Sequence, residues 1–392
     1  MIHVIGYSSI IKYFEWQNTM IEDLIALRHK LHQMPELSGQ ENKTINTLCE
    51  FIMPYQPTKI IQHLGKTGMA VVFGTGTKTL LLRADVDALP IQEKNTHNHM
   101  SLCQGKMHAC GHDGHSTMLV GVVPWLAKQD LKNSRVVLVF QPAEEIGKGA
   151  KDVTSDEKFA NLTPDYSFAL HNIPGYELGQ VLLRQGVFAS SSIGMIVTLQ
   201  GYASHASEPH HGVAPTLAMA QIIQTLSALP QFATALHEAT QVTVVYAKLG
   251  EIRFGTSPET AVVMATLRAH ESYVLETVKQ KATELCKNIA QAYGLQCDIQ
   301  WQEYFPSTKN NDEAMKLLTH AVENMNYTFL QNPFPWSEDF GYFTECSKGA
   351  MFGLGSGVNS PSLHNENYDF PDDLIPYGVN VFKSIIQQFI IL

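Results

Sequence analysis

The segment MHACGHDGHS, residues 107–116, holds three histidines, one cysteine and one aspartate within ten positions. Cys110 lies two residues before His112, while His108 and His115 lie four and three residues from that histidine. A thiolate and imidazoles at such short spacing suit a divalent transition metal. A nucleophilic cysteine with a helper histidine, or a polar loop around a buried thiol, would use the same residues. The segment alone leaves these three interpretations open.

Two adjacent glutamates, Glu144 and Glu145, follow the apolar run VVLVF in the segment QPAEE. Neighbouring side chains of an extended segment point to opposite sides, so one carboxylate could bind a metal while the other faces a substrate. The second carboxylate could accept the proton of an attacking water and return it to a leaving group. A solvated acidic turn is the alternative, but the position directly after a strand argues against it.

His171 and His364 are single histidines in apolar or turn segments. A lone histidine is more often a core or surface residue than a ligand, and only the joint pattern singles these two out. One cysteine, three histidines and one carboxylate are enough for two metal ions that share a ligand. Asp85 and Asp87 could orient the ligand imidazoles or could end a strand. Arg268 could bind an anion or could be a half-exposed strand residue.

These residues follow elements that predict a layered α/β domain. Helical spacing of apolar residues begins at Met20 and returns over residues 41–53 and 114–129. Strand-like runs cover residues 69–74, 79–85, 135–141 and 165–172, and several are apolar throughout, as in a parallel sheet covered on both faces. Ligands bind beyond the carboxyl ends of strands in open α/β sheets, so the four polar clusters could meet in one crevice.

The pattern changes at about residue 186. Strand, helix, strand, strand, helix and strand follow one another over residues 186–304, which is the order of a ferredoxin-like α+β unit. We therefore expect a catalytic domain of residues 20–185 and 305–392 with a mixed, mostly parallel sheet. Residues 186–304 would form an inserted domain, and residues 1–19 an extension or the product of a misplaced start.

Composition excludes several classes of protein. The 392 residues include 27 Lys and Arg against 37 Asp and Glu, a net charge of −10 without a cationic block, so a nucleic-acid partner is not expected. No apolar run is long enough to span a bilayer, and the N-terminus lacks the basic start and cleavage site of a signal peptide. The six cysteines are scattered without disulfide spacing, which indicates a reducing, cytoplasmic location.

The sequence as a whole resembles the M20 metallopeptidases, in particular their amidohydrolase branch, M20D. The resemblance runs from about Met20 to the C-terminus and rests on motifs that appear in family order: LRHKLHQMPELSGQE, LLLRADVDALPI, MHACGHDGH, FQPAEE, ALHNIPG, SHASEPHHG, TLRAH, SEDFGYF and LHNENYDFPDDLIPYG. It implies a catalytic α/β domain around a dinuclear metal centre, with an inserted lid domain that usually forms the dimer contact.

The resemblance also implies a role for each metal-binding residue. Cys110 would bridge two metal ions, His112 and His171 would complete one ion, and Glu145 and His364 the other. Zn²⁺ or Mn²⁺ would suit this ligand set best, and Co²⁺ or Ni²⁺ would also fit.

Two further residues would act on the substrate, Arg83 fits the M20D branch, and one lid segment departs from the family. Glu144 would be the general acid and base, and His205 the lid histidine that stabilises the oxyanion, often across a dimer. Arg83 stands where M20 enzymes outside this branch carry a ligand histidine. The lid segment N-V-I-P is missing around Pro258.

The expected activity is metal-assisted hydrolysis of the amide bond of an N-acyl-amino acid or dipeptide-like molecule, which includes carboxypeptidase activity. A homodimer or higher homo-oligomer through the lid domain is the expected assembly. Two rivals remain at this stage. One is a cysteine hydrolase that uses Cys110 and a nearby histidine. The other is a non-enzymatic binding protein on the same fold.

Overall fold

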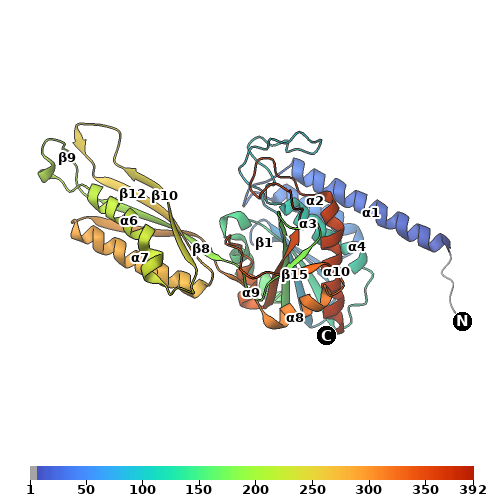
Figure 1. The fold of residues 1–392 in the computed structure, drawn as a ribbon. Coiled ribbons are helices and arrows are strands. Elements are labelled where there is room, and N and C mark those ends of the chain that lie inside the picture. The colour runs from blue at the N-terminus through green and yellow to red at the C-terminus, as the bar shows by residue number, and fades with distance from the viewer. Residues whose placement is uncertain (1–6) are drawn as a thin grey trace. The chain divides into compact units, whose positions relative to one another are not determined.

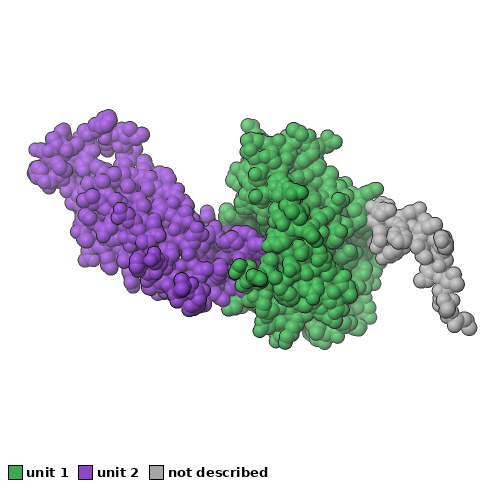
Figure 2. Space-filling model, in the orientation of Figure 1, with its two compact units in different colours: residues 1–186, 309–332, 342–392 green, residues 187–308, 333–341 purple. Residues whose placement is uncertain are grey.

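The computed structural model describes residues 7–392 and divides the chain into two compact units (Figures 1 and 2). The first unit holds the residues up to Gly186 together with Lys309–Asn332 and Tyr342–Leu392. The second unit holds Val187–Thr308 and Pro333–Gly341. Strands β7 (Gly186–Ala189) and β14 (Thr308–Asn310) and helix α9 (Gly341–Cys346) lie at the boundaries. The second unit is therefore an insertion in the chain of the first.

The first unit is built on an eight-stranded mixed sheet in the order β1-β2-β4-β3-β5-β16-β6-β15. The neighbours β4, β3, β5 and β16 run parallel, while β1, β2 and β6 join antiparallel neighbours. The mixed, mostly parallel sheet predicted for this domain is therefore confirmed. The strands are β1 (Lys59–Leu64), β2 (Gly68–Phe73), β3 (Lys78–Asp85), β4 (Ser134–Gln141), β5 (Tyr166–Ile173), β6 (Val181–Leu183), β15 (Tyr327–Phe329) and β16 (Lys348–Gly355).

Helices bury the sheet, which explains the continuous apolar strands. In β3, Leu80 and Leu82 join one large hydrophobic core while Leu81, on the opposite face, is also fully buried. The longer helices that contribute to that core are α1 (Tyr7–Gln33), α2 (Asn42–Ile52), α3 (His112–Val120), α8 (Asp312–Ala321) and α10 (Ile375–Ile391). Shorter helices are α4 (Val123–Leu126), α5 (Gly149–Thr154), η1 (Met53–Tyr55), η2 (Glu144–Ile146), η3 (Phe159–Asn161) and η5 (Asp372–Leu374).

The C-terminal helix corrects one expectation. By length and composition alone, Asp372–Ile391 could cross a membrane, although no run of sufficient apolar length was expected. Half of that segment is buried inside the protein, and Phe382, Ile385 and Phe389 of α10 pack into the core of the first unit. Packing against the sheet therefore accounts for its apolar face.

The second unit carries a four-stranded antiparallel sheet in the order β10-β12-β8-β13. Its strands are β8 (Ser191–Gln200), β10 (Thr240–Leu249), β12 (Thr260–Ala269) and β13 (Gln296–Phe305), and its helices are α6 (Thr216–Ala233) and α7 (Ser272–Ala292). A small hairpin pairs β9 (Ser204–His205) with β11 (Thr256–Ser257), followed by η4 (Pro209–His211). Chain order and strand order are those of the ferredoxin-like unit that the sequence predicts.

One segment lies elsewhere than expected. The predicted catalytic domain included all of residues 305–392, but Pro333–Gly341 belongs to the second unit. The backbone N–H and the hydroxyl of Ser190 both donate to the carbonyl of Phe334, and the ring of Phe188 packs 5.2 Å from the Phe334 ring. At the other end of the chain, residues 7–19 continue α1, and residues 1–6 of the predicted extension lie outside the described residues.

Candidate metal centre

The sheet brings four polar segments to one edge. Because β3, β4, β5 and β16 are parallel, their carboxyl ends lie side by side. Asp85 ends β3, Glu144 follows β4, His171 lies near the end of β5, and His364 follows β16. Helix α3 begins at His112 and is packed against β3 and β5. Residues more than 250 positions apart in the chain are thus collected by topology alone.

Cys110 and His112 are held by a tight turn into α3. Gly111 between them has φ +90°, and a Cβ atom there would lie 2.5 Å from the side-chain oxygen of Asn172, so only glycine fits. Nδ1 of His112 lies 2.9 Å from the backbone oxygen of Asp87, to which it can only donate. This contact places the lone pair of His112 on Nε2, the nitrogen available to a metal.

Potential ligand atoms form two groups that share Cys110. In one group the ligand atoms of Cys110, His112 and His171 all lie within 4.8 Å of one another, and all three residues are buried. In the other group the same holds for Cys110, Glu145 and His364. Nδ1 of His171 lies 2.9 Å from the backbone oxygen of Asn172, which leaves Nε2 to face Sγ of Cys110 at 3.6 Å.

The glutamate pair lies on the 3₁₀ turn η2 rather than in the extended segment assumed from the sequence. Ala143 adopts φ +53° and reverses the chain directly after β4. Ligand atoms of Glu144, Glu145 and His112 therefore lie within 4.8 Å of one another instead of pointing to opposite sides. Oε1 of Glu145 is 3.8 Å from Nε2 of His112 and 3.6 Å from Nε2 of His364.

The charges of the site favour a cation. Burial opposes the charged form of His112, but the carboxylates of Asp85, Asp87 and Glu145 overcome it and raise the pKa of His112 to about 10. Burial raises the pKa of Glu145 to about 7, against the opposing effect of His112. Three carboxylates thus face two cationic side chains, His112 and the Arg83 that pairs with Asp85, and this excess of negative charge is costly in a buried site.

The donor atoms themselves fit a metal. Among the residues that the structure describes, Oδ1 of Asp87, Nε2 of His112 and Oε1 of Glu145 are buried without a hydrogen-bond partner. Buried polar atoms without partners are rare and need an explanation. A thiol, imidazoles and a carboxylate form a donor set that divalent transition metals bind. A metal would satisfy the two ligand atoms and offset the excess charge.

A buried polar chain under the site was not anticipated. Nη1 of Arg83 lies 2.6 Å from Oδ2 of Asp85, whose Oδ1 lies 2.6 Å from Nδ1 of His115. Nε2 of His115 contacts the side-chain oxygen of Asn172, and Nδ2 of Asn172 donates to the hydroxyl of Tyr368 at 2.5 Å. Asp85 ends β3 and holds His115, which is not a proposed ligand, so its predicted role in orienting a ligand imidazole stays a prediction. No spacing in the sequence indicated Asn172 or Tyr368.

Two predicted residues lie in the second unit. His205 on β9 is exposed, with Nδ1 2.6 Å from the hydroxyl of Ser207, and its backbone pairs with Thr256. Arg268 on β12 is half-buried and donates to the hydroxyl of Ser337 at 3.0 Å. Arg268 also lines a cavity of about 260 Å³ within that unit.

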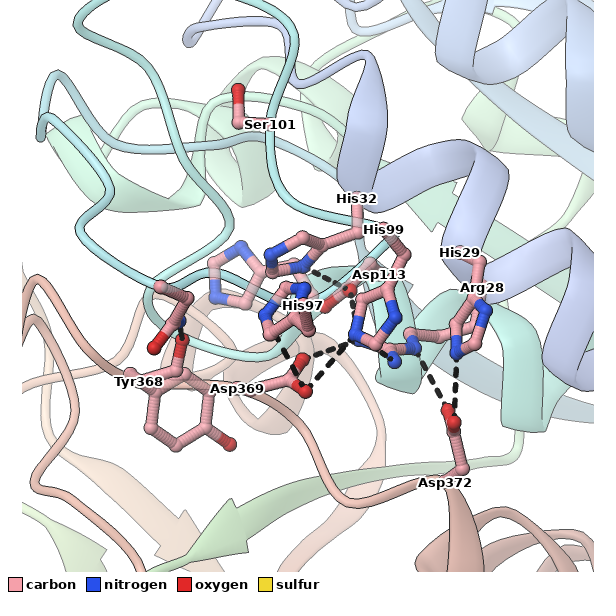
Figure 3. A network of polar contacts seen from close by, with 12 residues as sticks. Arg28, His29, His32, His97, His99, Ser101, Asp113, Tyr368, Asp369 and Asp372 are labelled. Carbon is pink, nitrogen blue, oxygen red and sulfur yellow. Dashed lines mark hydrogen bonds and ion pairs between the residues drawn. The ribbon is translucent and has the colours of Figure 1, made fainter.

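Sequence reasoning missed a second cluster of imidazoles and carboxylates in the first unit. It consists of six residues labelled in Figure 3, namely Arg28, His32, His97, His99, Asp113 and Asp369, together with Glu93, which contacts His32. The segments LRHKLHQ and NTHNHM carried its only signal, and their histidines His32 and His97 are 65 positions apart.

The fold and the site together define a class of enzyme. Residues 81–388 match the model of peptidase family M20/M25/M40, and the chain belongs to this family. The family resemblance found in the sequence is therefore confirmed, and the chain is a member of a family of hydrolases that cleave peptide and other amide bonds.

Individual relatives cover nearly the whole chain. The hippurate hydrolase of Campylobacter jejuni is 31% identical over 93% of this chain and 96% of its own. The N-acetyldiaminopimelate deacetylase of Listeria monocytogenes is also 31% identical, over 94% of this chain and 100% of its own. Among solved structures, the YXEP protein of Bacillus subtilis, described as a dinuclear metal-binding peptidase of the M20 family, has a TM-score of 0.79 at 25% identity, covering 94% of this chain and 98% of its own.

Proposed function

We propose that the protein is a dinuclear metal-dependent amidohydrolase that cleaves the amide bond of N-acyl-amino acids. The observation that carries the proposal is the pair of ligand groups that share Cys110. The thiolate of Cys110 would bridge two divalent ions, His112 and His171 would hold one, and Glu145 and His364 the other. Zn²⁺ and Mn²⁺ suit this set best, with Co²⁺ and Ni²⁺ as alternatives.

Bound ions would polarise the amide carbonyl and lower the pKa of the attacking water. The residues of the chain supply the rest of the chemistry. Glu144 is buried beside Glu145 and His112 and would accept the proton of the attacking water on a carboxylate oxygen. It would then deliver that proton to the nitrogen of the departing amine as the C–N bond breaks.

The backbone contacts of the imidazoles support this division of labour. The carbonyls of Asp87 and Asn172 hold His112 and His171 in the tautomer that leaves Nε2 free, so neither histidine is suited to shuttle the proton. Neither ligand group requires Glu144, whereas the other acidic residues described beside His112, Asp85 and Asp87, are held by Arg83, His115 and Ser38. In this proposal His205 donates to the developing oxyanion, and Arg268 binds the carboxylate of the amino acid.

The substrate class rests on the relatives. Hippurate and N-acetyldiaminopimelate, named for two of them, each carry an amide between an acyl group and an amino-acid nitrogen. We infer a small N-acyl-amino acid or dipeptide-like substrate for this chain, hydrolysed in the cytoplasm by a homodimer. The exposed apolar side chains of the second unit, among them Leu217, Phe232 and Tyr246, support self-association through that unit.

The test is release of amino acid from a panel of N-acyl-amino acids, run with each metal restored to metal-free protein. Glu144→Gln should keep the metal content of the wild type and lower turnover at least about a hundredfold, the scale of general-base loss. Glu157→Gln, on an exposed residue, is the matched control and should leave turnover unchanged. Near-normal turnover of Glu144→Gln would remove Glu144 from the mechanism.

A cysteine hydrolase is the second candidate, because Sγ of Cys110 lies 3.6 Å from Nε2 of His171. This candidate predicts that thiol alkylation abolishes turnover while a chelator does not. The dinuclear proposal predicts loss with both treatments, and recovery after chelation when metal is returned.

A further inference from the structure

The second cluster of imidazoles and carboxylates lies on three segments of the first unit that are far apart in the sequence. His32 is fully buried on α1, Glu93 and His97 lie on the loop between β3 and α3, and Asp369 precedes η5. Figure 3 shows the side chains of His32, His97 and Asp369 directed toward one another. None of these residues belongs to the ligand groups around Cys110.

The separations between these side chains match those of tetrahedral metal ligands. Ligand atoms of His32, His97 and Asp369 all lie within 4.8 Å of one another. Oε1 of Glu93 is 3.3 Å from Nε2 of His32 and 3.3 Å from Nε2 of His97, and Nε2 of His97 is 3.6 Å from Oδ2 of Asp369. Four ligands about 2.0–2.1 Å from a tetrahedral zinc ion stand roughly 3.3 Å apart.

Outer contacts hold the ligand atoms in place. Nδ1 of His32 lies 2.8 Å from Oδ2 of Asp113, the carboxylate–histidine arrangement that orients metal-binding imidazoles. The backbone N–H of Ser101 donates to Oε2 of Glu93 at 2.6 Å, which leaves Oε1 turned toward the histidines. Nη1 of Arg28 donates to Oδ1 of Asp369 at 2.6 Å, and Oδ2 lies 3.0 Å from Nε2 of His99 and 3.6 Å from Nε2 of His97.

The charges and the unsatisfied atoms also indicate a cation. Three carboxylates, those of Asp113, Asp369 and Asp372, contact the guanidinium of Arg28, and the carboxylate of Glu93 contacts His32 and His97. Oε2 of Glu93 accepts from the backbone N–H of Ser101, and its Oε1 lies 3.3 Å from each of the two histidines. Within the described residues, both ring nitrogens of His97 are buried without a hydrogen-bond partner.

Protons alone account for only part of this arrangement. A proton on His32 could bridge Asp113 and Glu93, whose carboxylate oxygens lie 2.8 Å and 3.3 Å from its two ring nitrogens. That proton does nothing for His97, whose ring stacks 3.7 Å from His99 and whose nitrogens remain unsatisfied. A metal ion would satisfy His32, His97 and both carboxylates at once.

We propose that His32, Glu93, His97 and Asp369 form a separate site for one divalent transition metal, with zinc as the best fit. Four protein ligands leave no open position, so the ion would be structural rather than catalytic. It would tie α1 to the loop that leads into Cys110 and to the segment that follows His364. The ion would therefore stabilise the two segments that carry Cys110 and His364. Its own binding does not depend on the dinuclear centre.

The test is the zinc content of three full-length proteins, dialysed against Zn²⁺ and measured by mass spectrometry. Wild-type protein should hold one ion more per chain than His97→Gln, whatever the content of the dinuclear centre. The matched control is His29→Gln, because His29 belongs to the same ring stack but faces Asp372. It should hold as many ions as the wild type. Equal zinc content in the wild type and His97→Gln would overturn the proposal.

Two further measurements guard against a folding defect in the variant. Zinc should raise the melting temperature of the wild type and of His29→Gln by several degrees more than that of His97→Gln, because binding to the folded state stabilises it. Crystals of the zinc-loaded wild type should show an anomalous scattering peak between Nε2 of His32 and Nε2 of His97. A protein that holds zinc at Cys110 but shows no peak here would contradict this site while leaving the proposed function intact.

Discussion

The buried pair of Arg83 and Asp85 allows a quantitative prediction about the support of the metal centre. Arg83 is 1% exposed and Asp85 0% exposed, and Nη1 of Arg83 lies 2.6 Å from Oδ2 of Asp85. Nε of Arg83 also donates to the side-chain oxygen of Gln141 at 2.8 Å. Removing one partner of a buried ion pair costs about 3–5 kcal/mol, because the other charge stays buried.

Replacing Arg83 with Met should therefore reduce the free energy of unfolding by an amount at the lower end of that range. Asp85 keeps its contact with His115 at 2.6 Å, so we expect a loss of about 3 kcal/mol in the free energy of unfolding. Arg135→Met is the matched control, since Arg135 lies on the neighbouring strand β4 and donates to the neutral hydroxyl of Thr79. Urea unfolding at pH 7, followed by circular dichroism, measures both variants.

The dependence on pH provides a second check of the same pair. Burial opposes the charge of Asp85, but His112, Arg83 and His115 hold its pKa well below the ordinary 3.8. The depressed pKa stabilises the fold above pH 3.8, and that contribution disappears as the pH falls. The difference between wild type and Arg83→Met should shrink in parallel. A loss at pH 7 no larger than that of Arg135→Met would refute the reasoning.

Two further predictions concern the turn into α3 and the second cluster. Gly111→Ala should lower the free energy of unfolding more than Gly105→Ala does. Both glycines have a positive φ, which costs an alanine about 1–2 kcal/mol. Of the two positions, Gly111 is the one where an added Cβ would also clash, 2.5 Å from the side-chain oxygen of Asn172. Urea unfolding measures the difference between the two variants. Equal losses in the free energy of unfolding would show that the side chain of Asn172 moves away from the new Cβ without an energetic cost. In metal-free protein, His32 should stabilise the fold fully below pH 6.5, and the contribution of about 3 kcal/mol should vanish as the pH rises through 9. Thermal unfolding of wild type and His32→Gln at pH 6 and 9.5 measures it, and a pH-independent difference between the two would contradict the raised pKa of His32.

The fold was largely predictable because its signals are local. The strands around Leu81 and Val137 are apolar throughout, as burial on both faces requires, and the alternation in β8 and β12 marks a sheet with one open face. The carboxyl ends of parallel strands gave a reason for Glu144, His171 and His364 to approach one another. The α/β pattern of the sequence continues without a break after residue 305, so nothing in it indicated that Pro333–Gly341 belongs to the second unit.

The rest of the site depends on contacts that no spacing encodes. The turn η2 follows from the positive φ of Ala143, a residue type that gives no warning of it. His32, His97 and Asp369 approach one another only because α1, a long loop and the chain before η5 are packed together, and single histidines in such segments are more often ordinary polar residues. Asn172 and Tyr368 entered the site in the same way, through tertiary packing.

The most direct test of the proposed function is a crystal structure of the full-length protein loaded with Mn²⁺ or Zn²⁺, with anomalous scattering data. The account predicts two ions on either side of Sγ of Cys110, one also bound by His112 and His171, the other by Glu145 and His364. Cys110→Ala should lose both peaks. A single ion that does not contact Cys110, or full occupancy of both ions in Cys110→Ala, would contradict the account.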